Sequence, residues 1–298
     1  MSNSWPGGLI RKTPVTPAGP YQDGAAPGVW SLSEAAYWTK QGLWPVAGNV
    51  NARGLIGGGY DWSGGANNNS IEYVTIATTG NSTDFGDLTA ARRQLTSCAS
   101  STRGLFSGGV TSGNVNTIDC VAILTAGNAV VFGALSTTNN SNYNAACASS
   151  TRGVIGGASS FGQSMYYVTI ATTGNSTLFG TLTVGHNGGA ACSSPTRGLF
   201  GGNNDSSNVI DYITIATTGN GTDFGDLLVG VGVSGSCSSS TRGLWGGGGS
   251  SPYTNVIQYV TIATTGNGVD FGDLLAGTGL LAACSSATRG LFQGGSSP

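Results

Sequence analysis

The chain has 298 residues, of which only 8% are charged, and its net charge is −2 at neutral pH. This composition excludes a basic surface for nucleic acid or anionic lipid, and no apolar run approaches the roughly 18 residues that a membrane helix needs. Disorder would require low hydrophobicity and high net charge, whereas 39% of these residues are hydrophobic. The 52 glycines are more than twice the usual share of about 7%, and they indicate a turn-rich all-β protein.

Residues 1–44 do not belong to the repeat that follows, and we expect them to form a docking arm. The stretch "TPVTPAGPYQDGAAPG" is rich in Pro and Gly and predicts an extended segment. Ser31 followed by Glu34 matches a capping box. We therefore expect one short helix over about residues 32–41, with Gly42 capping its end.

The segment "GVWSLSE…GLWP", within residues 28–45, resembles a segment that recurs in tail-fibre and other structural proteins of tailed phages. The later repeated sequence "YVTIATTGN…DFGDL" is also similar to repeats of phage virion proteins. This resemblance implies a virion protein that is assembled in the bacterial cytoplasm, is oligomeric in the particle, and docks onto other virion proteins through its arm. The arm residues expected to dock are Val29, Trp30, Leu32, Trp38 and Trp44.

After the arm, one stretch of eighteen residues occurs five times, beginning at residues 71, 118, 165, 210 and 257. In "IEYVTIATTGNSTDFGDL" two short strand-like stretches flank the turn "TTGN", whose Gly permits a tight hairpin. An apolar run ending at a Cys and the sequence "RGLFGG", or a variant of it, precede most copies. Each repeat therefore predicts four short strands, and a period of about 47 residues is typical of propeller blades.

The diglycine after the second strand, the aromatic residue in the third, and the Phe and Leu in the fourth resemble a kelch-type β-propeller. The fourth strand departs from kelch, because Phe-Gly stands where kelch usually carries Trp. We expect an all-β, kelch-like propeller over residues 45–298. A parallel β-helix is the alternative, although each repeat would then have to form a double rung.

Counting strands tests whether the ring closes. Residues 45–59 align with residues 281–295, so first and second strands occur six times and third and fourth strands five times. An open edge would expose unpaired backbone, so we expect six blades, the C-terminal half-blade being completed by strands from residues 1–44. A five-bladed ring with an overhanging hairpin is the alternative, and the helix expected in the arm weighs against six blades.

Two residue types hold fixed positions in the repeat. Five of the six cysteines occupy the same position in successive repeats, and this pattern predicts buried thiols rather than disulfides. An Arg recurs six times, and we expect it to pair with an Asp or a backbone carbonyl of the adjacent blade; binding of carboxylates or phosphates in a central channel is the alternative. These residues are Cys98, Cys147, Cys192, Cys237 and Cys284, and Arg53, Arg103, Arg152, Arg197, Arg242 and Arg289.

The sequence offers little catalytic chemistry, and we expect no enzyme, metal or cofactor. The single histidine, His186, lies in a loop without a partner motif and is expected to be solvated. The "DFGD" carboxylates are missing from two repeats, which favours hydrogen bonds to turns or to the repeat Arg over calcium binding or acid–base chemistry. These pairs are Asp84 with Asp87, Asp223 with Asp226, and Asp270 with Asp273.

The connections after the second and fourth strands vary, and in an up-and-down blade both sets lie on one face. Aromatic residues beside amides suit sugar rings or a protein partner, so a host-surface glycan is a candidate ligand. Drift in unconstrained loops explains the variation equally well, and a free carbohydrate-binding propeller or a glycan-cleaving one are alternative functions. The candidate binding residues are Tyr60, Trp62, Asn67, Tyr143, Phe161, Asn203, Asp205 and Tyr253.

Overall fold

The structure is a computed structural model that describes residues 4–5, 8–9, 31, 33–34, 36–37, 52–136, 144–157, 162–203, 205, 207–249 and 252–296. The chain divides into two compact units, one of residues 1–52 with 77–79 and one of residues 53–76 with 80–298. Each is described by itself. The boundary expected at residue 45 stays a prediction, because residues 38–51 lie outside the described part.

In the N-terminal unit, strands β1 (Ser4–Trp5) and β2 (Gly8–Leu9) pair in a sheet of their own. Residues 33, 34, 36 and 37 are helical, and the predicted capping box is present. The Ser31 amide donates to Glu34 Oε2 over 2.9 Å, and the Glu34 amide donates to Ser31 Oγ over 3.2 Å. The start of the helix is thus confirmed.

The predicted extended segment, the helix end and the docking residues of the arm fall on residues that are not described. Within the described residues, no helix is long and apolar enough to cross a membrane. The residues in question are Val29, Trp30, Leu32, Trp38, Gly42 and Trp44.

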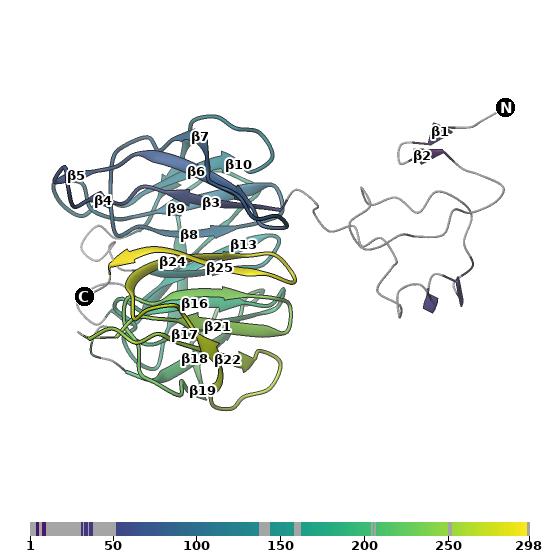
Figure 1. Cartoon of the computed structure of the whole chain (residues 1–298), viewed down its shortest axis with the longest axis vertical. Coiled ribbons are helices and arrows are strands. Elements are labelled where there is room, and N and C mark those ends of the chain that lie inside the picture. Colours follow the sequence, from purple (N-terminus) through teal and green to yellow (C-terminus); the bar gives the residue numbers. More distant parts are fainter. Residues whose placement is uncertain are drawn as a thin grey trace. The chain divides into compact units, whose positions relative to one another are not determined.

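The second unit is an all-β propeller (Figure 1), as the repeats predict. We name its sheets blades 1 to 5 and the C-terminal hairpin. Blades 2 to 5 are antiparallel, four-stranded and connected in chain order. They are β8 (Thr96–Ala99), β9 (Arg103–Ser107), β10 (Thr117–Ala122) and β11 (Val130–Ala134); β12 (Ala145–Ala148), β13 (Arg152–Gly156), β14 (Ser164–Thr169) and β15 (Thr177–Thr181); β16 (Ala190–Ser193), β17 (Arg197–Gly201), β18 (Val209–Thr214) and β19 (Thr222–Asp226); β20 (Gly235–Ser238), β21 (Arg242–Gly246), β22 (Val256–Thr261) and β23 (Val269–Asp273).

Blade 1 and the C-terminal hairpin have fewer strands. Blade 1 contains β3 (Arg53–Gly57), β6 (Ser70–Thr75) and β7 (Thr83–Asp87), and its predicted first strand falls on residues that are not described. A small hairpin of β4 (Tyr60–Asp61) and β5 (Ala66–Asn67) lies in its second connection. The C-terminal hairpin contains only β24 (Gly279–Ser285) and β25 (Gly290–Ser296).

The C-terminal hairpin lies between blade 5 and blade 1, where it appears in yellow in Figure 1. Ser285 Oγ donates to the Ser238 carbonyl of blade 5 over 2.8 Å. On the other side, Arg289 Nη1 donates to the Ile76 carbonyl of blade 1 over 3.0 Å. The ring is therefore closed, with five blades and a two-stranded hairpin in a sixth position.

The predicted completion of this sixth position is not observed in the described part of the chain. There, β25 pairs with β24 alone, and β1 and β2 pair only with each other. The structure thus combines the two expectations. Six positions surround the ring, but the described residues fill the sixth with two strands.

The hydrophobic core lies between neighbouring blades. One cluster joins Leu199 and Ile210 of blade 4 to Trp245 and Val260 of blade 5, and all four side chains are buried. The Trp245 indole also donates to the Ala190 carbonyl over 3.2 Å, which satisfies its polar atom. Each blade thus packs on both faces, as the apolar residues on both sides of the third strand predict.

Candidate functional site

The repeated Arg side chains connect neighbouring blades. Arg152 Nη1 donates to the carbonyls of Ile215 and Ala216 in the next blade, over 3.0 and 2.8 Å. Its guanidinium lies 4.3 Å from the ring centroid of Tyr167 in its own blade, in cation–π geometry. The prediction of a backbone-carbonyl partner is confirmed. Equivalent carbonyl bonds are made by Arg53, Arg103, Arg197 and Arg289.

The repeated cysteines also lie at blade junctions. All six cysteines are free thiols, which confirms the prediction against disulfides for the five repeated ones; three of these are buried, and Cys98 and Cys284 are partly buried. A Cβ built on Gly153 of blade 3 would lie closer than 3.0 Å to Cys98 Sγ of blade 2. The glycine of "RG" therefore makes room for the thiol of the preceding blade. Burial raises the pKa of Cys98 to about 12 and that of Cys284 to about 11. These thiols stay protonated and serve packing.

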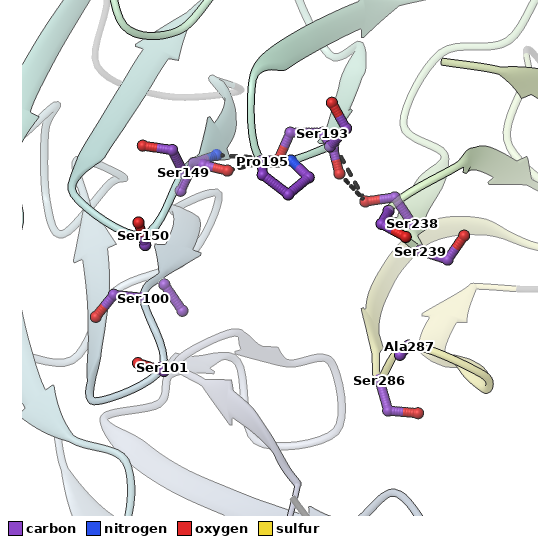
Figure 2. A pocket seen from close by; sticks show the side chains of 14 residues that line it. Ser100, Ser101, Ser149, Ser150, Ser193, Pro195, Ser238, Ser239, Ser286 and Ala287 are labelled. Atoms are coloured by element: carbon purple, nitrogen blue, oxygen red, sulfur yellow. Dashed lines mark hydrogen bonds between the residues drawn. The ribbon is translucent and has the colours of Figure 1, made fainter. Parts of the chain in front are cut away.

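The turns between first and second strands surround a hollow of about 340 Å³ at the centre of the ring (Figure 2). Its lining is Ser, Ala and one Pro, from blades 2 to 5 and the C-terminal hairpin. Several hydroxyls are already bound: Ser149 Oγ, for example, accepts from the Arg152 amide over 3.1 Å. No repeat Arg is among these lining residues, and five of the six donate to carbonyls of the next position instead, which argues against the alternative of an Arg-lined channel for anions.

The solvated position expected for His186 is wrong. The side chain is fully buried, its Nε2 lies 3.1 Å from Asp211 Oδ2, and its Nδ1 lies 2.8 Å from the Gly202 carbonyl. Thr183 donates to the same carboxylate from its amide and its hydroxyl. The loop that leaves blade 3 is therefore anchored onto blade 4. The sequence did not reveal this contact, because His186 lies in a connection that differs from repeat to repeat.

Two of the "DFGD" carboxylates accept hydrogen bonds within their own strands. Asp223 Oδ1 accepts from the Gly225 amide and Asp270 Oδ1 from the Gly272 amide, each over 3.1 Å. These bonds agree with a structural role rather than calcium binding or acid–base chemistry, but the donors are amides of the same strand, whereas turn amides or the repeat Arg were expected. Within the described ranges, no group of three His, Cys, Asp or Glu residues could hold a metal ion.

The variable connections lie together, as the strand order predicts. The loop after blade 4 bonds the loop after blade 3, from the Val233 amide to the Gly188 carbonyl over 2.6 Å. It also meets a second-to-third connection, since the Gly249 amide donates to the Gly232 carbonyl over 2.8 Å. The loops of this variable face are therefore tied to each other by backbone hydrogen bonds.

Three of the predicted binding residues gather on the β4–β5 hairpin. Trp62 is 77% exposed and meets Tyr60 edge to face, with ring centroids 5.0 Å apart. The Arg93 guanidinium lies 4.7 Å from the Tyr60 centroid. Asn67 accepts from Arg93 over 2.9 Å and donates to the carbonyls of Val110 and Thr111. We call Tyr60, Trp62, Asn67 and Arg93 the aromatic platform.

Arg93 was not among the predicted site residues, although a signal for it exists. It belongs to the "ARRQ" stretch, which occurs in only one of the fourth-to-first connections. Asp61 fixes the tip of the hairpin, since its Oδ1 accepts from the Ser63 amide and hydroxyl over 2.8 and 2.6 Å. These bonds lower the pKa of Asp61, so the tip carries a negative charge at neutral pH.

The remaining predicted residues do not join the platform. Asn203 is buried and accepts from the amides of Asp205 and Ser207, so it shapes its own loop. Asp205 is exposed, and the ring of Tyr253 packs over Gly279. Tyr143 and Phe161 lie outside the described residues.

Comparison of the chain with protein-family models and with curated protein sequences finds no match.

Proposed function

We propose that this chain is a non-enzymatic structural protein of a tailed-phage virion, which docks through residues 1–44 and displays the propeller. The observation that carries the proposal is the resemblance of "GVWSLSE…GLWP" to a segment of phage tail-fibre proteins. The capping box formed by Ser31 and Glu34 lies inside this segment. A helix start at that place supports its use as a folded docking element.

The contacts of the propeller support a rigid display body. The repeated Arg, Cys and Phe-Gly residues are used at the junctions between blades, where they join one repeat to the next. The kelch-like repeat pattern thus serves the ring itself. Recognition is left to the variable face, in particular to the aromatic platform and the exposed tip of its hairpin.

Deleting residues 1–44 tests the docking role. We expect the truncated chain to keep a strand-rich circular dichroism spectrum, because the described blades and their junctions lie beyond the deletion. We also expect it to be missing from purified particles, as measured by mass spectrometry and immunogold electron microscopy. The Trp62→Ala chain, which keeps the arm, is the control and should be incorporated. Incorporation of the truncated chain would refute the proposed docking role, and unfolding would place the arm within the ring.

A second candidate function, a free carbohydrate-binding propeller, is favoured by the aromatic platform. Exposed aromatic rings beside polar groups suit the apolar faces and the hydroxyls of sugars. Tyr60 packs edge to face against Trp62, Arg93 stacks on Tyr60, and Asn67 ties the platform to blade 2. A ligand would therefore meet a surface that is already ordered.

Trp62→Ala separates binding from stability. We expect it to reduce binding to host cells or to glycans on an array, because loss of such an anchor typically costs about 2 kcal/mol or more of binding. The melting temperature should stay within a few degrees, since Trp62 is exposed. Tyr253→Ala, whose ring packs on Gly279, is the matched control and should change stability instead. Unchanged binding by the Trp62 variant would remove the platform as a ligand site.

A further inference from the structure

At four junctions of the ring, the "TTGN"-type turn of one blade docks onto the fourth strand of the blade before it. In the first, the Gly127 amide donates to the Phe85 carbonyl over 2.7 Å, and the Asp87 amide donates to Asn128 Oδ1 over 3.0 Å. The same pair of bonds is made by Gly174 with Asn175, Gly219 with Asn220, and Gly266 with Asn267. The turn and the fourth strand thus form a repeated, specific contact.

This contact buries the aromatic residue of the fourth strand. Phe85 packs in a cluster with Phe106, Val121 and Ala129 of the next blade. The equivalent Phe side chains of blades 1 to 4 are only 2–3% exposed; they are Phe85, Phe132, Phe179 and Phe224. In blade 5 the equivalent residue is Phe271, and it is 52% exposed.

Near the exposed Phe271, other groups also lack the partners that their equivalents have in the filled junctions. Arg242 lies 4.6 Å from the Tyr259 centroid and stacks as Arg53, Arg152 and Arg197 do in their blades, but it makes no carbonyl bond within the described chain. Among the described residues, the neighbouring C-terminal hairpin has no third strand to supply one, and β25 pairs with β24 alone. On the far side, Gly80 and Asn81 of blade 1 have no fourth strand to dock onto among the described residues.

We propose that this sixth position binds a β-hairpin donated by a different protein, not by a second copy of this chain, and that this hairpin supplies the missing third and fourth strands. The four filled junctions define the occupant. Its first strand would pair with β25 and end in carbonyls that accept from Arg242. Its turn would carry Gly and Asn, as in "TTGN", and dock onto the Phe271–Asp273 edge of β23. Its second strand would carry an aromatic residue followed by Gly.

Strand addition suits this edge on physical grounds. β25 is seven residues long, and an unpaired edge of that length readily accepts a further strand. Main-chain bonds give affinity in such complexes, and side-chain sites give specificity. Here the specificity would come from Phe271 and Arg242. This inference does not depend on the proposed virion role.

The experiment uses the full chain and a labelled peptide of residues 257–274, "IQYVTIATTGNGVDFGDL", which is the chain's own third-to-fourth strand hairpin. We expect saturable binding by fluorescence polarisation. A peptide with Asn267→Ala should bind about tenfold or more weakly, because it loses the acceptor that each filled junction uses. A scrambled peptide should not bind. No saturation, or equal binding of the scrambled peptide, would overturn the proposal.

Variants of the full chain locate the peptide. Phe271→Asp and Arg242→Ala should each weaken binding about tenfold or more, since one places a charge at the docking edge and the other removes the donor. Both residues are exposed, so the melting temperature should stay within a few degrees. Trp62→Ala is the control and should leave peptide binding unchanged. Binding that neither variant weakens would overturn the proposal, and so would a dimer of the free chain that Phe271→Asp dissociates, because a second copy would then be the occupant.

Discussion

One buried position of the third strand shows how single residues determine the loops above them. In blade 2 it is Asp119, which pairs with Arg92 over 3.0 Å, and in blade 4 it is Asp211, which meets His186 over 3.1 Å. In blade 5 it is Gln258, which bonds the amide and carbonyl of Val229. The two carboxylates thus pair with basic side chains, and the side-chain amide of Gln258 bonds the backbone. In these three blades, the loop residue and the third-strand residue that binds it differ together.

Asp211→Asn tests the anchor of blade 4. We expect the free energy of unfolding at pH 7 to fall by about 1–3 kcal/mol, because a buried acceptor of several hydrogen bonds is altered. Burial acts to raise the pKa of Asp211, but the bonds from His186 and Thr183 outweigh it, and the pKa lies below 3.8. A depressed pKa stabilises the fold above about pH 3.8, and this stabilisation is lost as the pH falls through the folded value.

The difference between wild type and Asp211→Asn should therefore shrink as the pH falls below 3.8. Urea unfolding at pH 7, 5, 3 and 2 measures it. Asp205→Asn, which changes an exposed carboxylate, is the control and should leave stability nearly unchanged. An equally large difference at pH 7 and at pH 2 would show that the charge of Asp211 is not what stabilises the loop.

At the scale of strands, serine side chains join the first strands of neighbouring blades around the central hollow. Ser193 Oγ donates to the Ala148 carbonyl over 2.8 Å and accepts from the Ala148 amide over 3.3 Å. Ser238 makes the same two bonds to Ser193, and Ser285 makes them to Ser238. Blades 2 and 3 have Ala99 and Ala148 at this position, so the link between these two blades is missing.

Ala148→Ser should add that link. The new hydroxyl would reach the amide and carbonyl of Ala99, as Ser193 reaches those of Ala148, and a hydrogen bond of this kind contributes about 0.5–1.5 kcal/mol. We expect a higher midpoint of chemical denaturation. Ser193→Ala is the matched control and should lower it by a similar amount. A lower midpoint for Ala148→Ser would mean that blades 2 and 3 are spaced differently from the others.

The repeated elements could be predicted from the sequence, because their contacts are themselves repeated. The four-stranded blades, the Arg–carbonyl bonds and the free thiols each follow from a residue type that recurs at one position. Likewise, the capping box needs only Ser31 and Glu34. Short sequence motifs therefore predicted local geometry, and they also predicted the contacts that recur in each repeat.

The contacts that occur once could not be predicted in this way. His186 finds Asp211 only when two repeats pack together, and Asn67 finds Val110 only across a junction. Their residue types suit loops, so the sequence predicted a solvated His186, which is wrong, and it gave no sign of the bonds by which Asn67 reaches blade 2. Burial overrides this preference because a polar side chain at a junction must be paired.

At the scale of the whole molecule, the ring is uneven. Blades 1 to 4 each receive a turn from the next blade, whereas the described residues of the C-terminal hairpin offer no such turn to blade 5. Among the described residues, the contacts that close the ring include Ser285 with Ser238, Arg289 with Ile76, and Cys284 beside Gly54. The ring is thus continuous near its axis and incomplete at its outer edge, so equivalent residues are expected to differ in their contribution to stability.

Arg197 and Arg242 measure this difference directly, because they hold the same position in successive blades. Both stack on a tyrosine, at 4.5 and 4.6 Å, but only Arg197 also donates to two carbonyls of the next blade, over 2.9 and 3.0 Å. We expect Arg197→Ala to lower the free energy of unfolding by about 1–3 kcal/mol. Arg242→Ala loses only the stacking, worth about 0.5–1 kcal/mol at an exposed site. Denaturant titration of both variants beside wild type measures the gap. Equal losses would mean that Arg242 has a carbonyl partner too, so that a third strand from residues 1–44 of this chain already stands beside β25 and the ring is a complete six-bladed propeller.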